Sequence, residues 1–303
     1  MTEISNLQNP VYTDALLEFI IGNNVARGRI VRLKDSYKQA LAAHHYPHRI
    51  NEVLGHVATL GVMLTSSVKE KGIFTLQLQQ QAENRKVRLM IAEMTAEDSF
   101  RLTARLNEDV IIENSDTLPE LFGKNAIMAF TTDYNQGERY QGLAALDKDN
   151  LAEAATDWLN NSDQVQSIVS LRAAIDSNEQ GEIAFGLIIQ PLATQDLSVE
   201  EQHNHHEIWE TIRVFAESLK DEEALDEDLS LQDVLFRLFQ ELGVKITIGN
   251  EVSFHCRCSK DKFLSSIKNM DNETINELAD DNIIHTKCEY CGTKYDIALA
   301  EAL

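Results

Sequence analysis

Four cysteines near the end of the chain are its side chains best suited to metal or redox chemistry. Cys256 and Cys258 form a C-x-C pair in "FHCRCSKDKF", and Cys288 and Cys291 form a C-x-x-C pair in "KCEYCGTKY". The other 299 of the 303 residues include no cysteine. Where thiols are kept reduced, clustered cysteines indicate a metal site, a redox device, or both.

The spacing of the two pairs suits a tetrahedral Zn²⁺ ion. Two pairs separated by 29 residues offer four soft thiolates from two short turns, and a closed zinc site needs such ligands at about 2.3 Å. Gly292 suits a tight turn after the second pair. We therefore predict one zinc ion per chain in the reduced protein, bound by Cys256, Cys258, Cys288 and Cys291.

Other candidate sites are weaker. His255 and His285 lie near the cysteines in the sequence, but four thiolates already complete a zinc shell, so we expect neighbours rather than ligands. "HNHHE" at 203–207 lacks the pair of histidines four apart, with an intervening glutamate, that a metalloprotease helix carries. A glycine-rich phosphate loop, a nucleophile elbow and a convergent carboxylate pair are also missing, so no catalytic residue and no enzyme activity are predicted.

The charge of the chain argues against anionic partners. Its 49 acidic and 27 basic residues give a formal charge of −22, which repels nucleic acid and anionic lipid. A zinc ribbon that binds nucleic acid or another protein, with a purely structural zinc, remains the alternative. Residues 251–303 hold six Lys or Arg against ten Asp or Glu, the wrong sign for phosphate contacts. A salt-sensitive gel shift with DNA or RNA would favour that alternative.

Sequence signals for export are missing. The N-terminal stretch "MTEISNLQNPVYTDALLEF" has no basic segment followed by an apolar run, and no apolar run approaches the length of a membrane span. We therefore expect a cytoplasmic protein without membrane contact.

The elements that must position the cysteines indicate an α+β protein. Residues 11–70 are expected to be mostly helical, with the apolar stripe of "INEVLGHVATLGVMLTSSV" facing a core. From 72 to 146 the apolar period is two, as in antiparallel strands. In "GIFTLQLQ", "KVRLMIA" and "FRLTARL" the expected inward residues are Phe74, Leu76, Leu78, Val87, Leu89, Ile91, Phe100, Leu102, Ala104 and Leu106. Hairpins through "DYNQGERYQG" and "SIVSLRAAIDSNEQGEIAFGLIIQPL", with a helix near 150–160, complete an antiparallel-sheet core domain at 1–195.

An acidic segment and a small module follow this domain. Residues 196–230 hold twelve acidic and two basic residues, yet "HEIWETIRVFAESL" and "SLQDVLFRLFQEL" have apolar faces typical of amphipathic helices, with Ser230 as an N-cap. We expect an acidic helical linker at 196–250 and a C-terminal zinc-binding domain at 251–303, with short helices in "SKDKFLSSIKNM" and "DNETINELADD". A module this small depends on its metal to fold, so oxidation of the thiolates would release zinc and unfold residues 255–303.

The sequence resembles the bacterial redox-regulated 33-kilodalton heat-shock chaperones along nearly its whole length. The cysteine segments match that family's zinc-binding redox switch, and "ARGRIVRL", "GIFTLQLQ", "RYQGLAAL", "GLIIQPL" and "LFRLFQE" match its core and linker in the same order. The chain departs from the family at "QQAENRKVR", where a glycine-rich turn is usual.

The resemblance implies an ATP-independent holdase that acts in the stress response. The reduced, zinc-bound monomer would be inactive. Oxidation would form disulfides between Cys256 and Cys258 and between Cys288 and Cys291, release zinc, and unfold the module and linker. The oxidised form would dimerise, bind unfolding client proteins, and later pass them to an ATP-dependent foldase.

Overall fold

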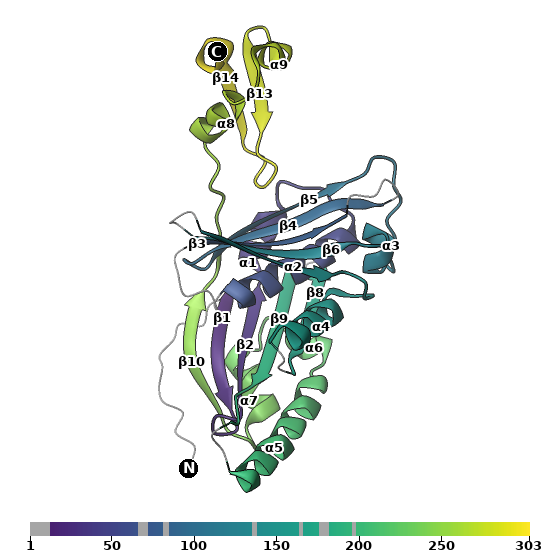
Figure 1. Cartoon of the computed structure of the whole chain (residues 1–303), viewed down its shortest axis with the longest axis vertical. Coiled ribbons are helices and arrows are strands. Elements are labelled where there is room, and N and C mark those ends of the chain that lie inside the picture. Colours follow the sequence, from purple (N-terminus) through teal and green to yellow (C-terminus); the bar gives the residue numbers. More distant parts are fainter. Residues whose placement is uncertain are drawn as a thin grey trace.

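Two sheets and a separate small module make up the molecule (Figure 1). The structure, a computed structural model, describes residues 13–65, 72–80, 85–134, 138–163, 166–175, 182–195 and 198–303. Nearly all neighbouring strands in the sheets are antiparallel, and helices lie between and around them. The predicted α+β class with an antiparallel core is therefore confirmed.

The first sheet has the strand order β10-β1-β2-β9-β8. Its strands are β1 (Ala15–Ile21), β2 (Ala26–Leu33), β8 (Ile168–Ile175), β9 (Glu182–Pro191) and β10 (Val244–Glu251). The expectation that residues 11–70 are mostly helical is wrong for this region, because β1 and β2 form a hairpin.

The reason for this error is that both faces of the hairpin are buried. Leu16 and Val31 face one apolar cluster, whereas Leu17 and Ile30 face another, so the apolar residues show no period of two. The residues of the turn, Gly-Asn-Asn at 22–24, were nevertheless a sequence signal for this hairpin. Their φ angles of 64°, 54° and 74° lie in the left-handed region that glycine and asparagine tolerate best.

The second sheet has the strand order β11-β5-β4-β3-β6-β7. Its strands are β3 (Gly72–Gln79), β4 (Val87–Thr95), β5 (Ser99–Leu106), β6 (Ile127–Tyr134), β7 (Arg139–Ala145) and β11 (Ser253–Phe254), and β11 runs parallel to β5. The expected turns in "DYNQGERYQG" and "IDSNEQGE" and the loop at 81–84 lie wholly or partly outside the described residues. The strands flanking both turns pair as predicted.

The faces of these strands decide which side chains meet the cysteine module. The inward residues predicted for β3 are confirmed, and in β5 Phe100, Leu102 and Ala104 are buried while Leu106 is only partly so. For β4 the prediction is wrong beyond Val87, because a register shift between Val87 and Leu89 turns Met90, Ala92 and Met94 inward instead. The same shift places Glu93 on the outer face, opposite Arg101 of β5.

Helix α2 (His48–Thr65) packs between the two sheets and contacts strands of both. Its predicted apolar stripe is buried in the main core cluster. Around it lie α1 (Asp35–Leu41), α3 (Leu118–Phe122) and α4 (Leu151–Asp163), and α4 confirms the helix expected near 150–160. Among the helices of the described ranges, none combines the length and apolar character that crossing a bilayer requires.

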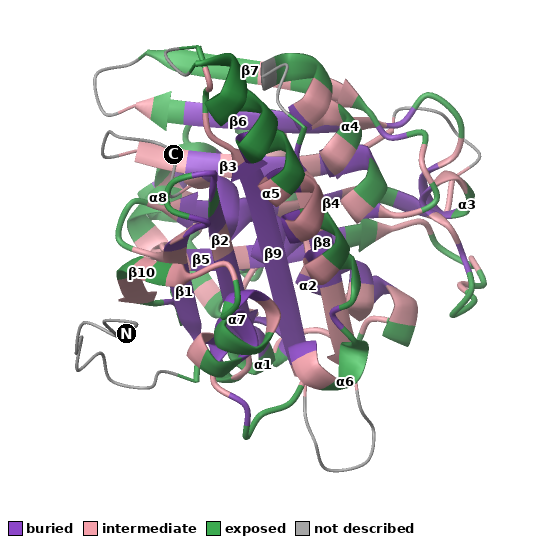
Figure 2. Ribbon diagram, turned by 90° about the horizontal axis from the view of Figure 1, so that it is seen from below, coloured by how far each residue is buried: buried purple, intermediate pink, exposed green. Residues whose placement is uncertain are grey.

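The acidic segment forms α5 (Val199–Glu217), α6 (Asp221–Ala224) and α7 (Leu231–Phe239). The central strands of the first sheet, β1, β2 and β9, are buried along most of their length behind these helices, whose outer sides are exposed (Figure 2). Ile212, Leu219, Val234 and Leu235 pack in the second apolar cluster with the sheet. The Ser230 hydroxyl accepts a hydrogen bond from the Asp233 amide at 3.1 Å, which confirms the predicted N-cap.

The expected helical linker at 196–250 requires one correction, because residues 244–251 form the edge strand β10 rather than a helix. Val244 and Ile246, two residues apart, pack on the second apolar cluster. A period of two in "VKITIGNE" was therefore the signal for a strand. The chain thus passes through both sheets, as β10 and then β11, before it reaches the cysteines.

The C-terminal module holds α8 (Lys260–Ile267), α9 (Asn272–Glu277), β12 (Ala279–Asp280), β13 (Ile283–Lys287), β14 (Lys294–Ala298) and α10 (Leu299–Ala302). Both predicted helices are confirmed. The module has a small apolar cluster of its own, centred on Ile267, Ile275, Ile284, Ile297 and Ala302. It stands on the outer face of the second sheet and is joined to the body by an extended segment (Figure 1).

Candidate metal centre

Two turns carry the four cysteines. Cys256 and Cys258 lie in the extended segment just before α8, which begins where the Ser259 hydroxyl caps the amide of Lys262. Cys288 and Cys291 lie in the turn of the β13–β14 hairpin. That turn is closed by hydrogen bonds from the Cys288 amide to the Thr293 carbonyl at 2.8 Å and from the Gly292 amide to the Cys288 carbonyl at 2.9 Å.

Glycine at position 292 is required for two reasons. Its φ angle of 72° is left-handed, and a Cβ atom there would lie 2.9 Å from the Cβ of Ala43 in the body of the protein. The turn that holds the second pair of cysteines is therefore built against the body.

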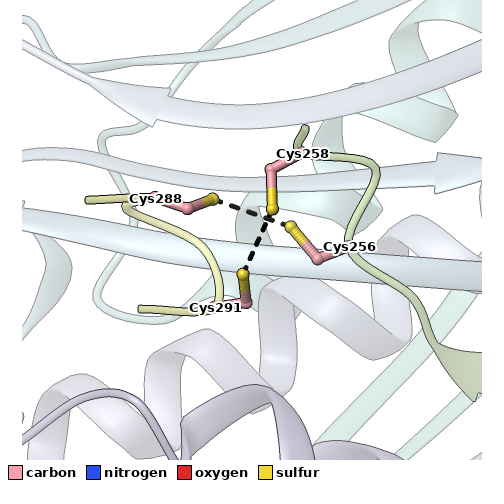
Figure 3. Close-up of side chains that lie close together, drawn as sticks. All are labelled: Cys256, Cys258, Cys288 and Cys291. Atoms are coloured by element: carbon pink, nitrogen blue, oxygen red, sulfur yellow. Dashed lines mark hydrogen bonds between the residues drawn. The ribbon is translucent and has the colours of Figure 1, made fainter. Parts of the chain in front are cut away.

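The four sulfurs converge (Figure 3). All lie within 4.8 Å of one another, with 3.7 Å between Cys256 and Cys288 and 3.4 Å between Cys258 and Cys291. A tetrahedral zinc site with Zn–S bonds of about 2.3 Å has sulfur–sulfur edges of about 3.8 Å. The four cysteines therefore fit a metal ion that prefers sulfur in a tetrahedral shell.

Polar groups of the module surround the sulfurs. The Tyr295 hydroxyl lies 3.1 Å from Cys258 Sγ, and the Thr293 hydroxyl lies 3.2 Å from Cys291 Sγ. The contact with Cys258 raises the pKa of Tyr295 to about 12, so the phenol keeps its proton and can donate it in a hydrogen bond to a thiolate. Such partners orient metal ligands and stabilise their charge.

The thiols differ in how readily they ionise. Burial raises the pKa of Cys256 to about 12 and also raises that of Cys288. Burial opposes ionisation of Cys291 too, but hydrogen bonds from Thr293, together with the neighbouring thiols, outweigh it and lower its pKa to about 7. A divalent cation would remove this difference, because its charge holds every coordinating sulfur as a thiolate.

The histidines take other roles. His285 Nδ1 lies 2.7 Å from an Asp296 carboxylate oxygen on the neighbouring strand. In the "HNHHE" stretch on α5, His203 faces Glu207 at 3.4 Å, and His205 is buried. Within the described ranges, the four cysteines are the group of side chains placed closely enough to hold one metal ion together.

A polar contact between the module and the body was not predicted. The Glu93 carboxylate on β4 accepts hydrogen bonds from Arg101 of β5 and from Arg257 and Tyr290 of the module. Burial alone would raise the pKa of Glu93, but the arginines and the tyrosine hydroxyl hold it below its usual value. The alternation in "FRLTARL" places Arg101 on the outer face of β5, and this was the available signal for the contact. The position of its partner Glu93 on the same face depends on the register shift in β4.

Comparisons with known proteins agree with this architecture. Residues 14–298 match the family model described as "Hsp33 protein". A 33 kDa chaperonin of Shewanella sp. (strain ANA-3) is 32% identical over 283 residues, which cover 93% of this chain and 92% of that protein. One from Actinobacillus pleuropneumoniae serotype 3 (strain JL03) is 31% identical over 284 residues, covering 93% and 90%.

A solved structure shares the fold. The crystal structure of the 33 kDa chaperonin (heat shock protein 33 homolog) from Thermotoga maritima superposes with a TM-score of 0.78 at 20% identity. The match covers 96% of this chain and 97% of the other. With the family model matched along nearly the whole chain, this protein belongs to the Hsp33 family of chaperones.

Proposed function

We propose that this protein is an ATP-independent holdase that binds unfolding proteins and prevents their aggregation under oxidative stress. The observation that carries the proposal is the convergence of four cysteine sulfurs in a small module attached to a chaperone-family body. Such a site has two chemical forms, metal ligands when reduced and disulfides when oxidised. The reduced form is inactive in this proposal, and the oxidised form is active.

Zinc is the metal that suits the site, because four soft sulfurs at tetrahedral spacing are its usual structural ligands. Bound zinc would hold the sulfurs as thiolates and tie residues 256–258 to residues 288–291. Structural zinc contributes about 10–16 kcal/mol to small modules, whereas a whole domain is stable by about 5–15 kcal/mol. The module's apolar cluster is small, so we expect it to unfold without the metal.

Oxidation of the thiolates removes the ligands and so releases the metal. Two molecules of hypochlorous acid accept four electrons from the four thiolates, together with two protons. The products are two disulfides, two chloride ions and two waters. We propose the pairs Cys256 with Cys258 and Cys288 with Cys291, each within one turn. The two short sulfur–sulfur distances quoted above join one turn to the other, so this pairing requires the sulfurs to rotate toward their sequence neighbours.

The linker at 196–250 is the second part that we expect to respond. Its helices α5 and α7 cover a large apolar face of the first sheet, which includes Phe19, Ile30 and Phe185. The linker's acidic residues repel one another, which weakens its folded form. If the linker detaches after the module unfolds, this face and the apolar side of the helices become available to clients.

The remaining parts of the proposal follow the family. Client proteins would bind to the oxidised form, which would be a homodimer, whereas the reduced form would be a monomer. Clients would later pass to an ATP-dependent foldase in the cytoplasm. The domain boundaries of the proposal are 1–195, 196–250 and 251–303, with β10 and β11 as the strands through which the module is attached to the two sheets.

The chemical part of this proposal can be tested by counting zinc and mapping disulfides before and after hypochlorous acid. Trypsin cleaves after Arg257, so a Cys256–Cys258 bridge would join two peptides, whereas Cys288 and Cys291 share the peptide 288–294. We expect one zinc per chain when reduced, none when oxidised, and both bridges. A reduced protein without zinc, or one that keeps zinc through oxidation, would contradict the proposal.

A further inference from the structure

The contact between the cysteine module and the second sheet has a partly buried polar centre. Arg101 Nε and Nη2 lie 2.9 and 2.6 Å from Glu93 Oε2, and both residues belong to the sheet. From the module, Tyr290 donates its hydroxyl hydrogen to Glu93 Oε1 at 2.9 Å, and Arg257 donates to Glu93 Oε2. One carboxylate of the sheet thus holds both turns that carry cysteines.

Arg101 connects this centre to the metal site. Its guanidinium carbon lies 4.0 Å from the centroid of the Tyr290 ring, in cation–π geometry. Its Nη1 lies 3.9 Å from Cys256 Sγ. A single side chain of the sheet therefore contacts the carboxylate, the aromatic ring and a cysteine ligand.

A second ion pair crosses the same boundary but differs in exposure. Arg105, four residues along β5, pairs with Glu289 of the module at 2.6 Å, and the two side chains are 57% and 54% exposed. The side chains of Arg101 and Glu93 are only 17% and 16% exposed. Exposed ion pairs contribute little to stability, whereas shielded charge-assisted hydrogen bonds contribute more.

We infer that Glu93 and Arg101 form a docking latch that couples the redox state of the cysteines to the position of the module. This inference rests on the proposed function. In the zinc-bound form, four thiolates and one divalent cation leave the site with two negative charges, which Arg101 and Arg257 complement. Conversion of the thiolates to two disulfides, with four electrons passed to hypochlorous acid, removes that charge and the thiolate next to Arg101.

The latch acts in both directions. If a metal-bound site favours docking, docking must favour retention of the metal by the same factor, because coupling between two equilibria is reciprocal. Arg101 is thus a positioning residue for the metal site, although it lies in the body of the protein. When the latch opens, the module leaves the outer face of β4 and β5, and both this face and the facing side of the module become exposed.

The test compares two arginine variants on one strand, Arg101→Ala and the control Arg105→Ala, in the full-length, reduced, zinc-loaded protein. One readout is hydrogen exchange of the His255 amide, which bonds to the Phe100 carbonyl at 3.0 Å. The other is the rate of zinc transfer to a chelator. For Arg101→Ala we expect both to rise roughly tenfold or more, the usual effect of losing hydrogen bonds to a charged group. For Arg105→Ala we expect a change below about twofold.

A third variant keeps the test decisive if Arg101→Ala disturbs the sheet. Glu93→Gln retains size and shape but removes the charge, and we expect it to behave as Arg101→Ala does. Rates equal to those of Arg105→Ala in a folded latch variant would overturn the latch, even if oxidation of the wild type releases zinc as proposed. A wild type that binds no zinc would instead contradict the proposed function, and the exchange of the His255 amide would still decide whether the latch docks the module.

Discussion

Cys256 belongs to both the candidate metal site and the contact with the body. Its sulfur lies with the other three cysteine sulfurs and within 3.9 Å of Arg101 on the second sheet. Burial raises its pKa to about 12, so without a cation this thiol would stay protonated at neutral pH. The side chain that touches the body is therefore one that needs the metal in order to carry charge.

Substitution Cys256→Ser should lower zinc affinity sharply and leave the sheets folded. Loss of partners that merely support a ligand lowers metal affinity by about 10–100-fold, and loss of the ligand itself should exceed that range. Competition with a chelator measures the affinity, and circular dichroism follows the fold. Global loss of structure would show that the module and the body do not fold independently.

Tyr295→Phe tests the environment of the sulfurs without removing one. The change deletes the hydroxyl 3.1 Å from Cys258 Sγ and keeps the ring, whose centroid lies 5.2 Å from that of Phe263. We expect about tenfold weaker zinc binding with unchanged helical content. Unchanged affinity would mean that the hydroxyl does not stabilise the thiolate.

At the scale of elements, the acidic linker is held by one buried arginine as well as by apolar packing. Arg32 on β2 donates to the Ala224 carbonyl at 2.9 Å and to the Leu229 carbonyl at 2.5 Å, around the connection between α6 and α7. The side chain is buried. This contact fixes the acidic turn at 226–228 to the sheet, although that turn has no apolar residue of its own.

Arg32→Met should therefore loosen the linker in the reduced protein. The loss of hydrogen bonds from a charged donor to buried carbonyls costs about 3 kcal/mol. We expect increased binding of an apolar fluorescent dye without oxidation, whereas Arg27→Met, at an exposed position of the same strand, serves as the control. Equal dye binding by the two variants would exclude this role of Arg32.

Helix α2 should make the stability of the body sensitive to acid. Burial, together with the charges of Arg49 and Arg172, lowers the pKa of His56 to about 3, whereas histidine in an unfolded chain titrates near about 6.5. Between these values the unfolded chain binds a proton that the folded chain does not. The free energy of unfolding should therefore fall as the pH falls from about 6.5 toward 3.

Urea unfolding at pH 7 and pH 5 measures this effect, with His56→Gln as the comparison. We expect the loss of stability between the two pH values to be smaller in the variant, because glutamine does not titrate. The same loss in both proteins would show that other groups account for the acid sensitivity.

Prediction from sequence worked where the apolar residues recur with a readable period and failed where they do not. Strands β3 and β5 alternate, and α2, α5 and α7 have apolar residues at helical spacing, so their patterns were readable. The β1–β2 hairpin is buried on both sides, and the bulge in β4 reverses its faces partway along. The spacing of the four cysteines was enough to predict that they come together. The contact of Glu93 with Arg257 and Tyr290 could not be predicted without the register of β4 and β5.

At the scale of the whole molecule, the first sheet separates two apolar clusters of different kinds. One lies between the sheets around α2 and includes no residue of the linker at 196–250. The other is shared with the linker helices and is exposed if they detach. The formal charge of −22 would help to keep a protein with such an exposed surface soluble. A core without linker residues therefore lies beside one that, in the proposed function, is exposed when the linker detaches.

Suppression of client aggregation before and after oxidation tests the central claim, that the redox state of the cysteines controls exposure of this surface. Light scattering of a thermally unfolding client enzyme is followed with one preparation, first reduced and zinc-loaded and then treated with hypochlorous acid. We predict strong suppression only after treatment, and its loss when a reductant and zinc are restored. Equal suppression by the reduced and oxidised forms would contradict the account.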